Sequence, residues 1–226
     1  MMSQTKKRNS APLANFRSTI YGFLAAIYRQ EVSSDLLQQI KDPRFLGVFT
    51  QLGIELNNGF FKKPEKELLD ALAVEYARLF LGPGKHVSPH ESVHHKRDDG
   101  QWGQLWGEST AEVKKIIESS GLEYKTEYTG IPDHISVELE FMQQVVMREE
   151  QAWQDDDKAT ARLCQENEKK FVDEHLFGWI PDFCEKVVTE ADLPFYREMA
   201  KLTRTFIEFE KQELNELKDD RGETSE

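Results

Sequence analysis

The chain lacks the marks by which disulfide-rich, membrane-spanning and secreted proteins are recognised. It has two cysteines, Cys164 and Cys184, which are too few for a disulfide framework, so we expect both thiols to be reduced. No apolar run reaches the roughly 20 residues that a transmembrane helix needs. Residues 20–28 are apolar and follow basic residues near the N-terminus, but no cleavage site of small residues comes after them. We therefore expect a cytoplasmic protein.

Basic residues are also scarce relative to acidic ones. The chain has 29 Lys and Arg against 41 Asp and Glu, which gives a net charge of −12. Such a surface is a poor match for nucleic acid and for anionic lipid. It suits a basic partner such as a peptide rich in Arg or Lys, although on charge alone plain solubility is the favoured explanation.

Strand patterns and internal repeats are absent as well. No stretch alternates convincingly with period two, and nothing recurs at 20–50 residues. Apolar residues recur instead at helical spacing along most of the chain. We predict an all-α fold of about nine to ten helices in one globular domain over residues 13–214. A disordered N-terminal segment at 1–12 and a charged, disordered tail at 215–226 complete the predicted organisation.

Helix signals give approximate boundaries inside that domain. We expect helices over about 15–29, from Ser33 or Ser34, from Asp42, from Pro64 to 80, from Ser109 or Thr110, over 132–153 and over 158–175, with a last long one after Asp192. Residues 81–106 and 122–131 are predicted loops, and residues 179–181 a tight junction. The first loop is rich in His, Trp and Gly, which favours a functional role.

The stretch 130–142 combines a polar cluster with an apolar stripe. Pro132 and Asp133 suit the first turn of a helix, where the Asp133 carboxylate faces the positive end of the dipole. His134 and Glu138 are four residues apart and share one helical face. Asp133, His134 and Glu138 fit a general acid–base set, but nothing supplies a nucleophile. From the spacing alone, simple capping by Asp133 and a surface position for His134 are the favoured explanation.

Histidines in the first predicted loop suggest a metal site. They stand four apart in two pairs, a spacing that can chelate a transition metal on a helix. Pro89 interrupts the first pair, and no H-E-x-x-H motif occurs. A metal-dependent hydrolase using these histidines with His134 is therefore the alternative reading, and we expect no resident metal or cofactor. The loop histidines are His86, His90, His94 and His95.

Acids and aromatics gather around the helix predicted at 132–153. Eight carboxylates and one base, Arg148, lie between residues 133 and 157. Aromatic side chains lie in or beside the two predicted loops, and together they suit a groove for a peptide that is part cationic and part apolar. A solvated helix face and ordinary core packing are the competing explanations. The aromatic residues are Tyr76, Phe80, Trp102, Trp106 and Tyr128.

Four motifs, in order, resemble those of the TorD/DmsD chaperones. Residues 76–84 read YARLFLGPG and residues 88–93 read SPHESV. Residues 132–142 hold PDHI followed by ELEFM, although Gly130 and Ile131 stand where the family usually has Glu or Gln and then Pro. Residues 175–183 read HLFGWIPDF, and residues 195–206 read FYREMAKLTRTF. The resemblance runs from about residue 14 to 213.

This resemblance implies a non-enzymatic, TorD-like helical chaperone. Such proteins bind the twin-arginine signal peptide, and the apo form, of a molybdopterin oxidoreductase of the dimethyl sulfoxide reductase type, and hold it for cofactor insertion before Tat export. Matched by position, the signal-peptide-binding residues are Tyr76, Leu79, Phe80, Pro89, His90, Glu91, Ser92, Asp133 and His134. Glu138, on the same helical face as His134, completes the predicted set.

The resemblance also bears on further partners. It implies contact with the Tat translocase or with molybdenum-cofactor machinery, and either a monomer or a domain-swapped dimer with residues 122–131 as the hinge. Weak guanine-nucleotide binding is implied too, although the sequence shows no nucleotide motif. Several reductases remain open as the client, including those for dimethyl sulfoxide, trimethylamine oxide and nitrate.

Overall fold

The computed structural model describes residues 10–43, 46–47, 54, 56, 60–82, 86–96, 102–122 and 130–219. Within this described part, regular structure is helical and no β-strand forms, which confirms the all-α prediction. The α-helices are α2 (Ala11–Arg29), α3 (Ser34–Lys41), α5 (Glu65–Tyr76), α6 (Glu91–His94), α7 (Glu108–Ser119), α8 (Ile135–Gln154), α9 (Lys158–Phe171), α10 (Phe177–Glu190) and α11 (Pro194–Asp219). A 3₁₀ turn, η1, spans Phe60–Lys62, and two π turns, η2 and η3, span Ala77–Leu81 and Val172–Leu176.

The π turns reduce the number of separate helices. Because η2 continues α5, and η3 joins α9 to α10, the described residues contain eight uninterrupted helices, slightly below the nine to ten expected. Most of the helix predicted from Asp42 lies outside the described residues. The junction predicted at 179–181 is wrong, since Pro181 lies inside α10. Trp179 and Ile180 are buried there, and that burial offsets the roughly 3 kcal/mol that a proline costs inside a helix.

Both ends of the folded part extend beyond the predicted limits. The first helix begins at Ala11 rather than near 15, with Pro12 in its first turn. The last helix runs to Asp219, past the predicted end of the domain at 214. Leu214 is buried, and the Lys169 Nζ donates to Asn215 Oδ1 at 2.6 Å, so these contacts hold the additional turn. The rest of the predicted disordered ends, residues 1–9 and 220–226, lies outside the described residues.

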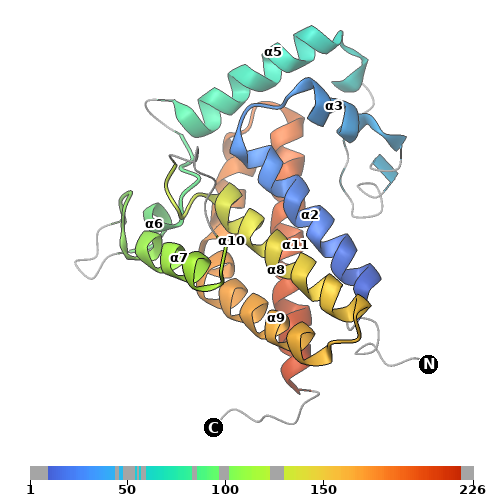
Figure 1. Cartoon of the computed structure of the whole chain (residues 1–226). Coiled ribbons are helices and arrows are strands. Elements are labelled where there is room, and N and C mark those ends of the chain that lie inside the picture. The colour runs from blue at the N-terminus through green and yellow to red at the C-terminus, as the bar shows by residue number, and fades with distance from the viewer. Residues whose placement is uncertain are drawn as a thin grey trace.

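Five long helices form the body of the molecule. α2 packs along α8, α8 along α9, and α10 along α11, as Figure 1 shows. The predicted apolar face of α8 is confirmed, because Ile135, Leu139, Met142 and Val146 are all fully buried. None of the helices in the described ranges is long and apolar enough to cross a membrane.

A buried arginine joins four of these helices. Arg17 on α2 donates to Glu149 Oε2 at 2.6 Å, to Glu168 Oε2 at 2.5 Å and to Glu210 Oε2 at 2.6 Å, on α8, α9 and α11. All four side chains are buried. Burial raises the pKa of Glu168 to about 7, because Arg17 only partly compensates for lost solvation. This ionic cluster has no signature in the local sequence.

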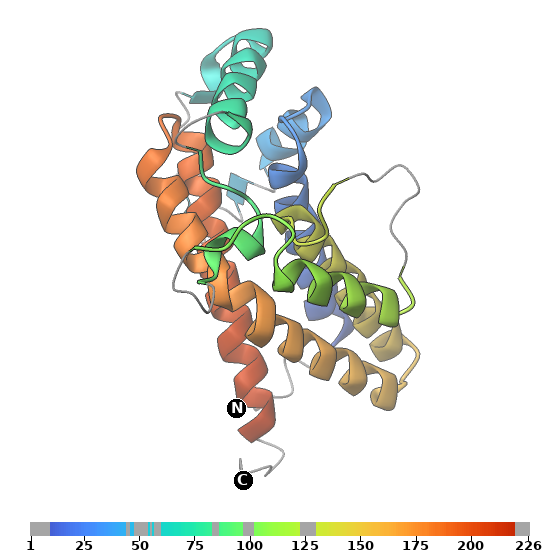
Figure 2. The same ribbon diagram turned by 90° about the vertical axis from the view of Figure 1, so that its left-hand side faces the viewer.

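Helix α5 crosses one end of the bundle, as both views show (Figures 1 and 2). Its Glu75 carboxylate accepts hydrogen bonds from the backbone N–H groups of Asp192 and Leu193 just before α11, at 2.6 and 3.3 Å. At its other end, Glu65 accepts from Ser34 Oγ at 2.5 Å. These contacts tie α5 to α3 and to the α10–α11 junction, so it forms a bridge over the end of α2.

Candidate functional site

Two groups of predicted site residues meet at the N-terminus of α8. The loop between η2 and α6, part of the stretch predicted to be irregular, forms an isolated antiparallel bridge between His90 and His134. The Glu91 N–H donates to the Asp133 carbonyl at 3.0 Å, and the two imidazole rings stand edge to face with centroids 4.9 Å apart. Pro89 is buried, and its carbonyl accepts from the N–H of Ile135 at 2.9 Å.

Asp133 caps a different helix from the one expected. The backbone before α8 is extended by the bridge, so the helix begins at Ile135 and not at Pro132. The fully buried Asp133 carboxylate accepts from the Ser92 N–H at 2.8 Å, and thereby caps α6. His134 caps α8 instead, because its Nδ1 accepts from the Ser136 N–H at 3.1 Å. Burial, with help from the nearby His90 and Arg29, lowers the pKa of His134 to about 3, which keeps Nδ1 an acceptor.

Glu91 and Glu138 belong to a buried network and not to an open acid–base site. The Glu91 carboxylate pairs with His175 Nδ1 at 3.0 Å and with His95 Nε2 at 3.0 Å. Burial works against that charge, but the two histidines lower the pKa of Glu91 overall. Glu138 is fully buried and accepts from Trp179 Nε1 at 3.1 Å. Burial raises the pKa of Glu138 well above its ordinary value, and the neighbouring Glu91 adds to that rise.

The side chains at the end of α5 and in η2 that were predicted to contact a peptide lie in the core. Tyr76, Leu79 and Phe80 are all buried. The Tyr76 hydroxyl donates to the Tyr28 carbonyl at 2.9 Å, and the Phe80 ring packs edge to face against Tyr28. Contact of these three side chains with a peptide stays a prediction. Tyr128 lies outside the described residues.

The loop histidines are held separately and do not converge. The His94 Nε2 lies 2.7 Å from the Ser88 carbonyl oxygen and its ring packs on Trp179, whereas His95 pairs with Glu91. In the described ranges no three His, Cys, Asp or Glu side chains are placed to hold a metal ion. The hydrolase reading therefore finds no support in the arrangement of these residues.

An open groove lies where the end of α2 meets α3 and α8. Two adjoining cavities, of about 460 and 470 Å³, share Arg29, Gln30, Glu31 and Ser33, where α2 passes into α3. We call the pair of cavities the α2–α3 groove. One end reaches α8 at Glu140 and Gln143. The other end reaches Tyr76, a predicted site residue at the end of α5, and Leu81 at the end of η2.

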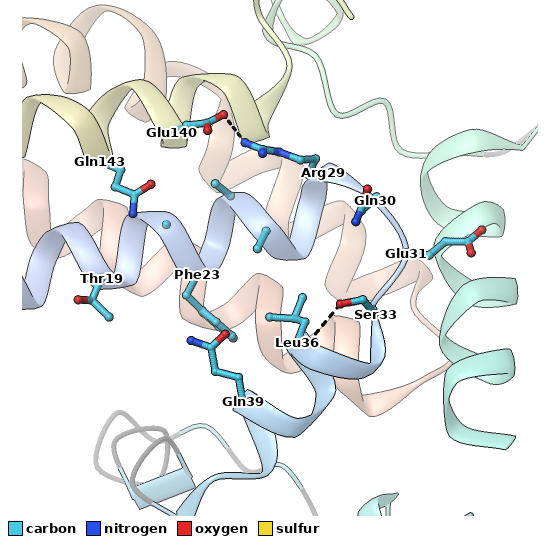
Figure 3. Close-up of a pocket in the computed structure, with 13 residues that line it drawn as sticks. Thr19, Phe23, Arg29, Gln30, Glu31, Ser33, Leu36, Gln39, Glu140 and Gln143 are labelled. Atoms are coloured by element: carbon cyan, nitrogen blue, oxygen red, sulfur yellow. Dashed lines mark hydrogen bonds and ion pairs between the residues drawn. The ribbon is translucent and has the colours of Figure 1, made fainter. Parts of the chain in front are cut away.

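The lining of the α2–α3 groove is both acidic and apolar. Figure 3 shows Arg29 paired with Glu140 on one wall, with Glu31 farther along the same chain segment. Phe23 and Leu36 contribute apolar surface, and Leu81, at the far end, is 64 % exposed. Sequence reasoning missed Arg29, Glu31 and Glu140 as site residues, because α2 and α8 are more than 100 residues apart in the chain.

Comparison with known proteins gives a consistent set of relatives. A family model described as nitrate reductase delta subunit matches residues 44–185. The chaperone protein TorD of Shewanella pealeana is 26 % identical over 214 residues, which cover 87 % of this chain and 88 % of that protein. TorD of Vibrio vulnificus is 22 % identical over 219 residues, covering 91 % and 95 %.

The fold has a counterpart among solved structures. A crystal structure described as a redox enzyme maturation protein from Archaeoglobus fulgidus aligns with a TM-score of 0.52 and 19 % identity. The alignment covers 85 % of this chain and 94 % of the other. At this identity the likeness establishes a shared fold.

Proposed function

Because this chain belongs to the nitrate reductase delta subunit family, whose TorD-type members are redox enzyme maturation chaperones, we propose that it binds the twin-arginine signal peptide of its client. The proposed client is a molybdopterin oxidoreductase of the dimethyl sulfoxide reductase type. In this role the protein acts in the cytoplasm and holds the apo-enzyme for cofactor insertion before Tat export. The chaperone carries no catalytic residues of its own.

The observation that carries the proposal is the chemistry of the α2–α3 groove. A twin-arginine signal peptide presents two adjacent guanidinium groups followed by an apolar stretch. Carboxylates at Glu31 and Glu140 suit the guanidinium groups, since arginine pairs with carboxylates through charge-assisted hydrogen bonds. Phe23, Leu36 and Leu81 offer apolar surface in the same groove. The groove therefore matches both halves of the ligand.

Three residues of the predicted peptide-binding set, Tyr76, His90 and His134, hold the segments that form this groove. The buried Tyr76 lines one of its cavities and holds the end of α2 through the Tyr28 carbonyl. The bridge between His90 and His134 fixes the start of α8, the helix that carries Glu140. On this view the two histidines position the groove and its acidic wall.

Arg29 occupies the place of an incoming guanidinium. In the free protein it pairs with Glu140, and both side chains remain partly exposed. An arginine of the peptide can replace it at little cost, because exposed ion pairs contribute about 0–1 kcal/mol. The pairing keeps Glu140 oriented until the peptide arrives.

Isothermal titration calorimetry with a synthetic peptide, two arginines followed by an apolar stretch, tests the proposal. The double variant Glu31→Gln/Glu140→Gln should bind the peptide at least about tenfold more weakly, since two charge pairs are lost. A control of equal charge change, Glu67→Gln/Asp70→Asn on α5, should bind as the wild type does. Unchanged affinity in the groove variant would refute this site.

A further inference from the structure

The α2–α3 groove holds an uncharged polar side chain beside its acidic residues. Gln143 of α8 lines the cavity of about 460 Å³ and is partly buried. Figure 3 shows its amide group reaching across toward α2. No hydrogen bond forms between this amide and any other residue in the described ranges. Because a primary amide can both donate and accept, one that lies unpaired in an open groove is available to a ligand.

A glycine on α2 makes room for this amide. A Cβ built on Gly22 would lie 2.2 Å from the Gln143 Nε2 and 2.7 Å from its Cδ, so any other residue at position 22 would displace the amide. Glycine is unfavourable inside a helix, and Gly22 lies well inside α2. The close approach of Gln143 gives a physical reason for it. Gly22 therefore determines where the amide can lie.

The amide lies beside the carboxylate that we propose for one arginine of the peptide. Glu140 and Gln143 are three residues apart on α8, so their side chains are neighbours on one face of that helix. Both line the same cavity, where Arg29 is paired with Glu140. A group that replaces Arg29 at Glu140 therefore comes close to the Gln143 amide as well.

Arginine and lysine differ in what they can donate to such a pair of side chains. A guanidinium is a planar fork with more N–H groups than one carboxylate accepts, so some remain for a neighbouring acceptor. An ammonium is a compact charge that a carboxylate and water can satisfy. Carboxylates alone attract both cations, because Coulomb attraction depends on charge and distance. An amide oxygen beside the carboxylate therefore favours arginine.

We propose that Gln143 makes the α2–α3 groove selective for arginine over lysine. When a guanidinium pairs with Glu140, one of its remaining N–H groups donates to the Gln143 Oε1. The amide N–H₂ group stays against Gly22 on α2. This role rests on the proposed function of the groove, and it adds a preference that Glu31 and Glu140 do not supply by themselves.

Isothermal titration calorimetry with two synthetic peptides tests this role. Both peptides carry two cationic residues followed by the same apolar stretch, and they differ only in having arginines or lysines. Gln143→Met keeps the length of the side chain without its amide. The variant should bind the arginine peptide about fivefold more weakly, because one hydrogen bond to a charged group is lost. Its affinity for the lysine peptide should stay unchanged, which also shows that the variant is folded.

A second glutamine in the same cavity provides a matched control. Gln39 of α3 is exposed and lines the cavity on the side away from Glu140, as Figure 3 shows. Gln39→Met should leave the affinities for both peptides at their wild-type values. An equal loss of arginine binding in Gln39→Met and Gln143→Met would overturn the specific role of Gln143.

Gly22→Ala tests whether the glycine places the amide. The new methyl group displaces the flexible end of Gln143, while every charged group of the groove remains. The variant should therefore bind the arginine peptide about fivefold more weakly, and the same change should have no further effect in a Gln143→Ala background. An equal loss in both backgrounds would show that Gly22 acts independently of the amide, and would overturn its placing role.

Failure of this role is distinguishable from failure of the groove itself. Gln143→Met could keep the wild-type ratio of arginine to lysine affinity while Glu31→Gln/Glu140→Gln loses peptide binding. The groove would then bind the peptide, and the role of Gln143 would be overturned. If Glu31→Gln/Glu140→Gln binds as the wild type does, the groove is refuted together with every role assigned within it.

Discussion

Replacing Glu168 by glutamine should stabilise the protein at pH 8, although it removes a buried partner of Arg17. Burial raises the pKa of Glu168 from its ordinary 4.5 to about 7. This rise corresponds to about 3 kcal/mol in favour of the protonated side chain in the folded state. Because the folded pKa lies above the unfolded one, this stability is fully present below pH 4.5 and is lost as the pH rises through 7.

Glutamine cannot ionise, so Glu168→Gln should keep that contribution at high pH. Its amide N–H₂ group lies where Glu168 Oε1 has no hydrogen-bond partner, and an unsatisfied donor there costs about 1–2 kcal/mol. The net gain at pH 8 is therefore about 1–2 kcal/mol. At pH 5 the wild-type carboxyl is already protonated, and the variant should be less stable by about 1–2 kcal/mol.

Urea unfolding followed by circular dichroism at pH 5 and pH 8 measures both values. Glu166→Gln, an exposed position on the same helix, serves as the control, and its stability should stay within about 0.5 kcal/mol of the wild type at both pH values. If Glu168→Gln is less stable by the same amount at both pH values, attraction to Arg17 outweighs desolvation and the reasoning fails.

Two further substitutions test the contacts that hold the helices. Arg17→Leu leaves three buried carboxylates without their shared donor, and should lower the free energy of unfolding by about 3–5 kcal/mol in urea at pH 8. The control Arg204→Leu, on the exposed face of α11, should lower it far less. Equal losses in the two variants would contradict the role of the buried cluster. Asp133→Ala removes the cap of α6 and should lower the free energy of unfolding by about 1 kcal/mol. The backbone amide of Ser92 should then exchange its hydrogen faster. An unchanged exchange rate would contradict the capping role of Asp133.

Three of the predicted peptide-binding residues also hold the framework of this chain together. Asp133, Glu91 and Glu138 are buried and join α6, α8 and α10 through hydrogen bonds to Ser92, His175 and Trp179. Substituting them would disturb the framework as well as any ligand contact. The exposed acids of the α2–α3 groove therefore provide the sharper test of peptide binding.

The sequence by itself determined what depends on neighbouring residues. Helical spacing of apolar side chains predicted the all-α fold and the buried face of α8. Local hydrogen-bonding chemistry predicted a cap at Ser33 or Ser34, and Ser33 accepts from the N–H of Leu36. The motifs at 76–93 and 132–142 indicated the family, because they record constraints that related chains share.

Only the tertiary structure decided which side chains are buried and which share a site. Arg17 and Glu210 are 193 residues apart yet form one ion pair, and Asp133 caps a helix that lies 41 residues before it. The α2–α3 groove likewise combines residues from distant segments. Burial and long-range pairing depend on how helices pack, and no local pattern of residues encodes that geometry.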